Sequence, residues 1–233
     1  MEALRLSAEQ QALPPAALPV VETFHSLQGE GTHAGRSAWF LRLAGCTVGC
    51  PWCDTKVSWP QAAHPQRSTA DLAAEAAAVA VAGAAFAVIT GGEPLHHDLG
   101  PLCEALAVSG LPLHLETSGV DPLSGRFDWI TLSPKRHRPP RPGLLAACDE
   151  LKVVVHEQAD LDFAEAMAAQ AREARAEAGS TDRAGAADVR DPPHLLLQPG
   201  WESDAGLDLA VAFVQRHPGW RLSLQSHKWL GLR

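Results

Sequence analysis

The chain has 233 residues, of which 46% are hydrophobic, and it carries a formal net charge of −8. This length and apolar content suit a single domain with its own core, and the negative charge argues against a general nucleic-acid-binding surface. No apolar run approaches the roughly 20 residues of a membrane span, and residues 1–19 lack the pattern of a secretory signal peptide. We therefore expect a cytoplasmic protein that acts on a small molecule, with no nucleic-acid or membrane partner.

Short apolar segments alternate with helix-like segments, which is typical of a parallel α/β sheet. The predicted strands are residues 20–24, 37–44, 86–90, 113–116, 128–132, 150–155, 194–197 and 221–224. The predicted helices are residues 69–82, beginning with a cap at Ser68 or Thr69, 99–108, 161–176 and 206–216. Because the chain is short for an eight-fold barrel of about 250 residues, we predict an incomplete, partly open (β/α) barrel.

The chain is expected to hold one domain, residues 20–233, after a loosely ordered N-terminal extension, residues 1–19. Residues 179–191 are rich in small and polar residues and have no apolar period. We predict a mobile surface loop there, and no domain boundary.

Five predicted strands are followed at once by polar residues, glycine or proline. These segments are Gly91-Gly-Glu-Pro, Thr117-Ser-Gly, Ser133-Pro-Lys, Gln198-Pro and Gln225-Ser-His-Lys. The carboxyl ends of parallel barrel strands gather on one face, where such barrels build their active sites. Any one of these segments could equally be an ordinary polar loop, but the five together predict a composite site.

Three cysteines lie close together in the run Cys46-Thr-Val-Gly-Cys50-Pro-Trp-Cys53. On spacing alone, zinc ligation and thiol redox chemistry are alternatives. A purely structural zinc or iron–sulfur site has four protein ligands as a rule. The remaining cysteines, Cys103 and Cys148, lie in apolar, helix-like contexts that are typical of buried free thiols. The run is therefore an incomplete metal site.

The residues around the last cysteine, Trp52 before it and Asp54-Thr55 after it, make the run resemble the C-x₃-C-x-aromatic-C signature of radical S-adenosylmethionine (SAM) enzymes. This resemblance implies a 4Fe-4S cluster held by Cys46, Cys50 and Cys53, with one iron left open to bind SAM.

Further motifs narrow the resemblance. They are Leu27-Gln-Gly-Glu-Gly, Arg42-Leu-Ala-Gly-Cys46, Cys50-Pro-Trp-Cys53-Asp-Thr-Lys, Thr90-Gly-Gly-Glu-Pro, Glu116-Thr-Ser-Gly, Ser133-Pro-Lys and Leu224-Gln-Ser-His-Lys. In sequence and order they resemble the 7-carboxy-7-deazaguanine synthase family of queuosine and 7-deazapurine biosynthesis, from about residue 20 to the C-terminus.

The resemblance implies a lyase that converts 6-carboxy-5,6,7,8-tetrahydropterin to 7-carboxy-7-deazaguanine with loss of ammonia. A 5′-deoxyadenosyl radical, formed from SAM, would take a hydrogen from C6 of the pterin. The resemblance also implies Mg²⁺, an external one-electron reductant of the flavodoxin or ferredoxin type, and a homodimer.

The same resemblance implies roles for individual residues, with no catalytic side chain beyond the cluster and SAM. Cofactor contacts are implied for Trp52, Cys53, Asp54, Gly92, Ser133, Pro134 and Lys135. Substrate contacts are implied for Leu27, Gln28, Gly29, Glu30, Arg42, Thr90, Gln225, His227 and Arg233. Thr55 matches the magnesium ligand of the family.

Three of these residues have plain alternatives. Arg42 alternates with leucines, so it should face the barrel interior and bind a substrate carboxylate, or else pair with Glu22 or Glu30. Thr55 taken alone would be a loop hydroxyl that satisfies backbone amides. Gln225 and His227, two apart on the last predicted strand, should face one side, although a structural role suits His227 nearly as well.

Two other classes of protein share the cysteine run. A glycyl-radical-activating enzyme has the cysteine motif, but it does not need Gln28-Gly-Glu-Gly, Cys53-Asp-Thr or the terminal Gln225-Ser-His-Lys. A non-catalytic zinc or iron–sulfur protein would use the cysteines without chemistry.

Overall fold

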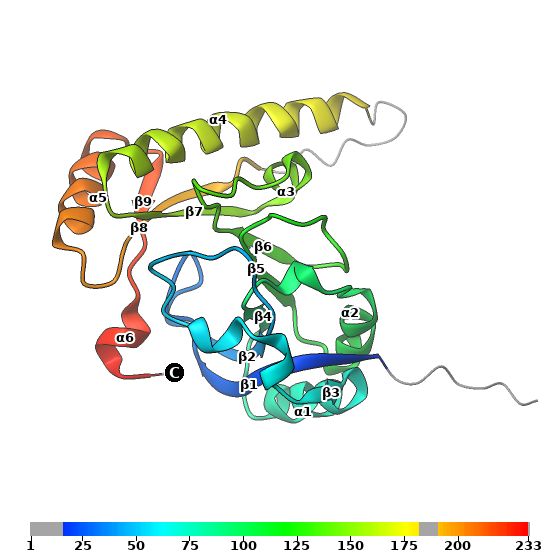
Figure 1. The fold of residues 1–233 in the computed structure, drawn as a ribbon. Helices are drawn as coiled ribbons and strands as arrows, with labels where there is room; N and C mark the ends of the chain where they lie inside the picture. The colour runs from blue at the N-terminus through cyan, green and yellow to red at the C-terminus, as the bar shows by residue number, and fades with distance from the viewer. Residues whose placement is uncertain (1–15, 182–190, 233) are drawn as a thin grey trace, which may run out of the picture.

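A curved sheet that does not close is the centre of the molecule (Figure 1). The computed structural model describes residues 16–181 and 191–232, and the strand order within them is β3-β1-β2-β4-β5-β6-β7-β8-β9. The strands are β1 (Ala17–Leu27), β2 (Ser37–Leu43), β3 (Gln66–Ser68), β4 (Ala87–Gly91), β5 (Leu113–Thr117), β6 (Trp129–Leu132), β7 (Glu150–Val155), β8 (His194–Pro199) and β9 (Trp220–Leu222). Neighbours from β2 to β9 run parallel, and β1 is antiparallel to both β2 and β3. The predicted incomplete barrel is confirmed.

Helices lie along the sheet, with α4 crossing beside β7 and α5 beside β8 and β9 (Figure 1). They are α1 (Thr69–Val81), α2 (Gly100–Leu106), α3 (Pro142–Ala147), α4 (Gln158–Thr181), α5 (Asp204–Arg216) and α6 (Ser226–Leu230). Ser68 caps α1 as predicted, because its hydroxyl accepts the backbone N–H of Asp71 at 3.1 Å. Within the described residues, no helix is long and apolar enough to cross a membrane.

Alternation along the strands separates the core from the inner face of the sheet. Leu41, Leu43, Ile89, Leu115 and Leu151 are fully buried in one large apolar cluster. Successive side chains of a strand point to opposite faces, so the polar residues between these positions face the inside of the curved sheet. Each buried leucine or isoleucine contributes about 1.5–3 kcal/mol through the removal of its side chain from water.

The C-terminal segment differs from the prediction. β9 ends at Leu222, and Ser226–Leu230 forms α6, so Gln225 and His227 do not lie on a strand. The pairing of β9 with β8 runs from Leu195 to Leu197. Two residues further along β8 stands Pro199, which has no N–H to donate, so one hydrogen bond of a longer ladder would be missing there.

The structure corrects the N-terminal boundary as well. Ala17, Leu18 and Pro19 pair with β3, and Leu18 is buried, so this part of the predicted loose extension is ordered strand. Residues 1–15 of that extension lie outside the described residues, and so does most of the predicted surface loop, residues 182–190. The first residues of that loop, up to Thr181, belong to α4. The short elements β3, α3 and α6 were not predicted.

A stack of histidine and aromatic rings fills the end of the sheet where the parallel strands begin. The His114 ring lies 4.2 Å from that of Phe86 and 4.7 Å from that of His33 between centroids, and Trp129 lies 4.5 Å from His33. Burial, with the charges of His33 and Arg36 added, lowers the pKa of His114 to about 3. His114 is therefore neutral in the folded protein near pH 7.

We expect acid to destabilise the fold through His114. Its folded-state pKa of about 3 lies below the ordinary value of 6.5. Between these two pH values the unfolded chain is protonated at His114 and the folded chain is not. The stabilisation is fully present above the unfolded pKa and is lost as the pH falls toward the folded value, by up to about 2 kcal/mol at about pH 5. Urea unfolding at about pH 7.5 and about pH 5 measures this loss. His114→Gln, which removes the titrating ring, should lose correspondingly less between the two pH values, and an equal loss would contradict the assignment.

Candidate active site

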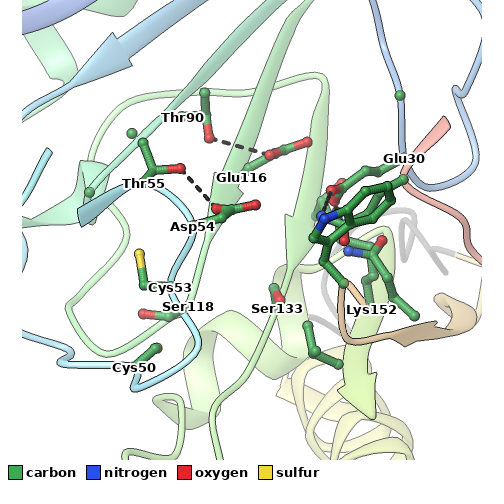
Figure 2. Close-up of a pocket in the computed structure, with 18 of the residues that line it drawn as sticks. Glu30, Cys50, Cys53, Asp54, Thr55, Thr90, Glu116, Ser118, Ser133 and Lys152 are labelled. Carbon is green, nitrogen blue, oxygen red and sulfur yellow. Dashed lines mark hydrogen bonds and ion pairs between the residues drawn. The ribbon is translucent and has the colours of Figure 1, made fainter. Parts of the chain in front are cut away.

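A cavity of about 500 Å³ opens at the carboxyl ends of the parallel strands. Its walls come from the ends of β4 to β8, from β1 and β2, from the segment after β2 that carries the three cysteines, and from α6. Figure 2 shows labelled side chains of the cysteine loop, of β4, β5 and β7, and of the loop between β1 and β2 around one space. The gathering of polar strand ends on one face is therefore found as the sequence predicts.

Nearly all predicted site residues line this cavity. They are Leu27, Gln28, Gly29, Glu30, Arg42, Cys46, Cys50, Trp52, Cys53, Asp54, Thr55, Thr90, Gly92, Ser133, Lys135, Gln225 and His227. Pro134 is buried between two lining residues and is not part of the wall. Arg233 lies outside the described residues.

The cysteine loop, residues 45–59, is held by backbone hydrogen bonds. The N–H of Gly45 donates to the carbonyl of Ser58 at 2.7 Å, and that of Cys46 to the carbonyl of Trp59 at 3.3 Å. The loop also meets the end of β4. A Cβ on Gly92 would lie 2.4 Å from the carbonyl oxygen of Gly45 and 2.9 Å from the Cβ of Cys46, so only glycine allows this approach.

The three cysteines are free thiols of intermediate burial, and all of them line the cavity. Burial raises the pKa of Cys46 and Cys50. In the described part of the chain, no three His, Cys, Asp or Glu side chains are close enough together to hold a metal ion. A single zinc ion needs such convergence, whereas a 4Fe-4S cube binds each cysteine through a different iron and takes them farther apart. All three thiols line the same cavity, as the ligands of one cluster must.

Asp54 joins the cysteine loop to the C-terminal helix. Its carboxylate accepts the Thr55 hydroxyl at 2.9 Å (Figure 2) and pairs with the ammonium of Lys228 on α6. Burial works against ionisation of this carboxyl, but the hydrogen bond and charge of Lys228 lower its pKa. The Lys228 ammonium also lies 5.0 Å from the centre of the Trp201 ring. An ionised carboxylate and a hydroxyl therefore stand side by side at the rim of the cavity.

Glu30 pairs with a lysine that was not predicted. The ammonium of Lys152, on β7, contacts one oxygen of Glu30, and the Gln225 amide donates to the other at 2.8 Å. The two charged side chains are 5% and 17% exposed, so the pair is nearly buried. Burial alone would raise the pKa of Glu30, but Lys152 overcomes this and lowers it to about 2, and Glu30 raises the pKa of Lys152 against its own burial. Glu30 is thus an anion with accepting oxygens only.

The loop that carries Glu30 spans the open side of the sheet. Gly31 N–H donates to the Ser223 hydroxyl at 2.9 Å, and Thr32 N–H to the Glu150 carboxylate at 2.7 Å. The carbonyl of Gly29 accepts the backbone N–H of Ser226 at 2.9 Å. The β1–β2 loop is therefore fastened to β7 and to the segment after β9, at the other side of the sheet.

His227 packs directly on this loop. A Cβ on Gly29 would lie 2.1 Å from the Nδ1 atom of His227, so glycine at this position lets the ring lie against the backbone. The ring lines the cavity, and the contact also serves packing.

Two further polar groups of the cavity belong to β5 and β2. The Glu116 carboxylate accepts the Gln28 amide at 2.9 Å and the Thr90 hydroxyl at 3.3 Å (Figure 2). Arg42 faces the cavity, and its Nε donates to Glu22 at 3.0 Å. Of the two alternative partners that the sequence left open for Arg42, Glu22 is the one found, since Glu30 is paired with Lys152.

Sequence reasoning missed four charged residues of the cavity: Glu93, Glu116, Lys152 and Lys228. Glu93 is buried and accepts from the side chains of Thr117 and Ser118. Two signals were available. Glu93 and Glu116 lie in motifs that follow or end strands, and Lys152 alternates with apolar residues along β7, which places it on the inner face.

Comparisons with known proteins agree with this geometry. The model of the radical SAM superfamily matches residues 41–134. The chain is 53% identical over 222 residues to a 7-carboxy-7-deazaguanine synthase of Prochlorococcus marinus, over 92% of this chain and 98% of that one. A Synechocystis protein of the same name is 47% identical, over 92% of this chain and 93% of its own. The crystal structure of QueE from Escherichia coli is 32% identical with a TM-score of 0.68, covering 91% of this chain and 95% of that chain.

The open α/β barrel and the cysteine loop define a radical SAM enzyme, a class that uses a 4Fe-4S cluster and SAM. Within that class, the chain belongs to the 7-carboxy-7-deazaguanine synthase family.

We expect Lys152→Met to destabilise the protein strongly. The substitution leaves the Glu30 carboxylate buried without its counter-charge, and breaking one side of a buried pair costs about 3–5 kcal/mol. Urea unfolding measures the loss.

Two controls separate this effect from general damage. The double variant Glu30→Gln/Lys152→Met removes both charges and should regain much of the stability. Arg67→Met breaks a pair with Glu75 whose side chains are 30% and 31% exposed, and should cost less than the change at Lys152, because water screens the pair. An equally small loss for Lys152→Met would show that the pair does not hold the loop.

Proposed function

We propose that this protein converts 6-carboxy-5,6,7,8-tetrahydropterin to 7-carboxy-7-deazaguanine with loss of ammonia. The observation that carries the proposal is the 53% identity, over 92% of the chain, to a protein named for this product. A second line of support is that the cysteine loop and the polar strand ends face one cavity.

Cys46, Cys50 and Cys53 would hold the 4Fe-4S cluster. When bound, the cluster and SAM supply a radical that takes hydrogen from C6 of the pterin, a step beyond ordinary acid and base side chains. The protein contributes orientation and exclusion of water. Beside the cysteines, the backbone of Gly92 and the side chains of Trp52, Asp54, Ser133 and Lys135 would contact SAM. Pro134, which is buried between Ser133 and Lys135, would hold these two residues in position.

The other wall of the cavity would bind the pterin. Glu30 is an anion with accepting oxygens, which suits the amino and ring N–H groups of a pterin. Gln28, Thr90 and Glu116 form a hydrogen-bonded set beside it. Leu27, Gly29, Gln225 and His227 would complete this wall, and Arg233 is proposed on the family resemblance alone.

Arg42 would bind the carboxylate of the substrate. Its Nε atom is engaged by Glu22, and a guanidinium has further donors that remain for a second carboxylate. The interaction is bidentate and charge-assisted, so it would also fix the orientation of the pterin.

We assign the Mg²⁺ site to Thr55. Mg²⁺ prefers oxygen ligands and keeps several waters, binding through few protein groups and substrate oxygens. The Thr55 hydroxyl stands 2.9 Å from an ionised carboxylate of Asp54, which supports a cation at this rim.

Three further parts of the proposal rest on the resemblance and on the free thiols. The electron would come from a carrier of the flavodoxin or ferredoxin type, and two copies of the chain would form a homodimer. Free thiols persist in a reducing compartment, so we place the enzyme in the cytoplasm.

One assay tests the activity. Reconstituted protein with SAM, dithionite, Mg²⁺ and the carboxytetrahydropterin should form the deazaguanine. Cys50→Ala should lose the cluster and turnover, whereas Cys103→Ala, at a buried thiol of α2, should keep both. SAM cleavage without product would indicate another substrate, such as a glycyl-radical enzyme. A colourless zinc protein without SAM cleavage would refute the radical reaction.

Thr55→Ala should raise the Mg²⁺ concentration needed for half-maximal activity about tenfold, because the metal loses a ligand. Iron content should stay at the parent value, since the hydroxyl contacts Asp54 and no cysteine. Thr55→Ser keeps the hydroxyl and is the matched control. A magnesium titration decides, and an unchanged midpoint in the alanine variant would remove Thr55 from the site.

A further inference from the structure

A run of basic residues lies against one side of the cysteine loop. The basic segment, Lys135-Arg-His-Arg-Pro-Pro-Arg141, follows β6 in a chain whose net charge is −8. Arg136, His137, Arg138 and Arg141 are all exposed. A concentration of positive charge on an otherwise acidic protein calls for a specific explanation.

The basic segment touches the loop that carries the cysteines. Arg138 donates from Nη1 to the backbone carbonyl of Thr47 and, at 3.1 Å, to its hydroxyl. The Nε2 atom of His137 lies 3.1 Å from the carbonyl of Val48. The same imidazole meets the Trp52 ring edge-on at 5.6 Å. The loop residues that the segment touches thus lie one or two positions from the nearest cysteine.

Two charges of this surface are not neutralised. Arg136 pairs with Glu157 and with Asp160. Arg138 donates to oxygens of Thr47, and the Nε of Arg141 donates to the carbonyl of Val120 at 3.1 Å, so both bind neutral partners. A nearby acid, Asp121, is paired with His96. Among the described residues, Arg138 and Arg141 therefore have no ion pair.

The outer side of the cysteine loop is also open to solvent. Thr47, Gly49, Pro51 and Trp52 are exposed, while the cysteines themselves face the cavity. SAM and the substrate would occupy the cavity, so an electron donor must approach from outside. The exposed residues of the loop, next to the basic segment, are sequence neighbours of the cysteines: Thr47 follows Cys46, Gly49 and Pro51 flank Cys50, and Trp52 precedes Cys53.

We propose that Arg138 and Arg141, with the exposed residues Thr47, Gly49, Pro51 and Trp52, form the docking surface for an acidic one-electron carrier protein of the flavodoxin class. The inference rests on the proposed function, which requires such a donor. One electron leaves the flavin hydroquinone, which becomes the semiquinone, and reduces the cluster by one unit of charge. Complementary charge steers such encounters and selects the partner.

A nucleic acid fits this surface less well than an acidic protein does. Two guanidiniums without an ion pair, on a chain of net charge −8, would release few counterions from a nucleic acid.

Direct binding tests the surface. The probe is a bacterial flavodoxin in its hydroquinone form, titrated anaerobically into the reconstituted protein by calorimetry. Arg138→Gln/Arg141→Gln should raise the Kd about tenfold at low ionic strength, and the difference from the parent should shrink as salt screens the charges. Arg138→Lys/Arg141→Lys keeps the charge and should stay within about twofold of the parent.

Matched controls separate docking from damage. Arg172→Gln/Arg216→Gln removes the same charge from exposed positions on α4 and α5 and should leave the Kd unchanged. Turnover with dithionite, which needs no docking, should be equal in all variants. If Arg138→Gln lowers the iron content of the protein, the single variant Arg141→Gln is used for the flavodoxin titration instead, because the bond of Arg141 to Val120 lies outside the cysteine loop.

Three results would overturn the inference. The flavodoxin Kd of Arg138→Gln/Arg141→Gln could equal that of the parent, or the Kd of Arg172→Gln/Arg216→Gln could rise by as much. The third is that Arg138→Gln/Arg141→Gln binds a transfer RNA more weakly than the parent does but binds flavodoxin equally well. Failure of the parent to form product with dithionite would instead reject the proposed function, and the flavodoxin Kd could still be measured.

Discussion

A nearly buried ion pair joins the two sides of a sheet that does not close. Glu30 stands on the loop between β1 and β2, and Lys152 stands on β7, on the other side of the open barrel. If either side chain were buried here without its partner, the lost hydration of its charge would cost several kcal/mol. The folded position of the β1–β2 loop therefore depends on its contact with β7. The loop that closes the fold is thereby the loop that forms one wall of the cavity.

The period of two along each strand explains how a core and a polar cavity coexist in a single layer of strands. Leu151 and Val153 of β7 are buried under the helices, whereas Lys152 between them reaches inward. The inner positions can be polar because neighbouring strands supply partners, as Glu116 does for Thr90. Changes on one face can therefore alter the cavity without removing apolar side chains from the core.

Apolar alternation and chain length were enough to predict most strands, the larger helices and the open barrel, and the strand-end motifs predicted a composite site. The individual residues that line the cavity were named mainly through the family resemblance. Pairwise contacts were not predictable, because Lys152 meets Glu30 across 122 positions of sequence. The C-terminal segment was predicted as strand from its local pattern, and the structure has a helix there. β9 pairs with β8 only from Leu195 to Leu197, and this limit is a feature of pairing that the local sequence of β9 does not contain.

The short helix α6 connects the parts of the cavity that would perform different tasks. Lys228 holds Asp54 beside Thr55 and the cysteines, and Gln225, just before the helix, holds Glu30 on the opposite wall. The backbone N–H of Ser226 adds a bond to Gly29. These contacts come from one segment of a few residues, so a shift of α6 would move the rim at Asp54 and Thr55 and the wall at Glu30 together. The geometry of the two proposed sites is thus set by the same C-terminal residues, and each depends on the other being in place.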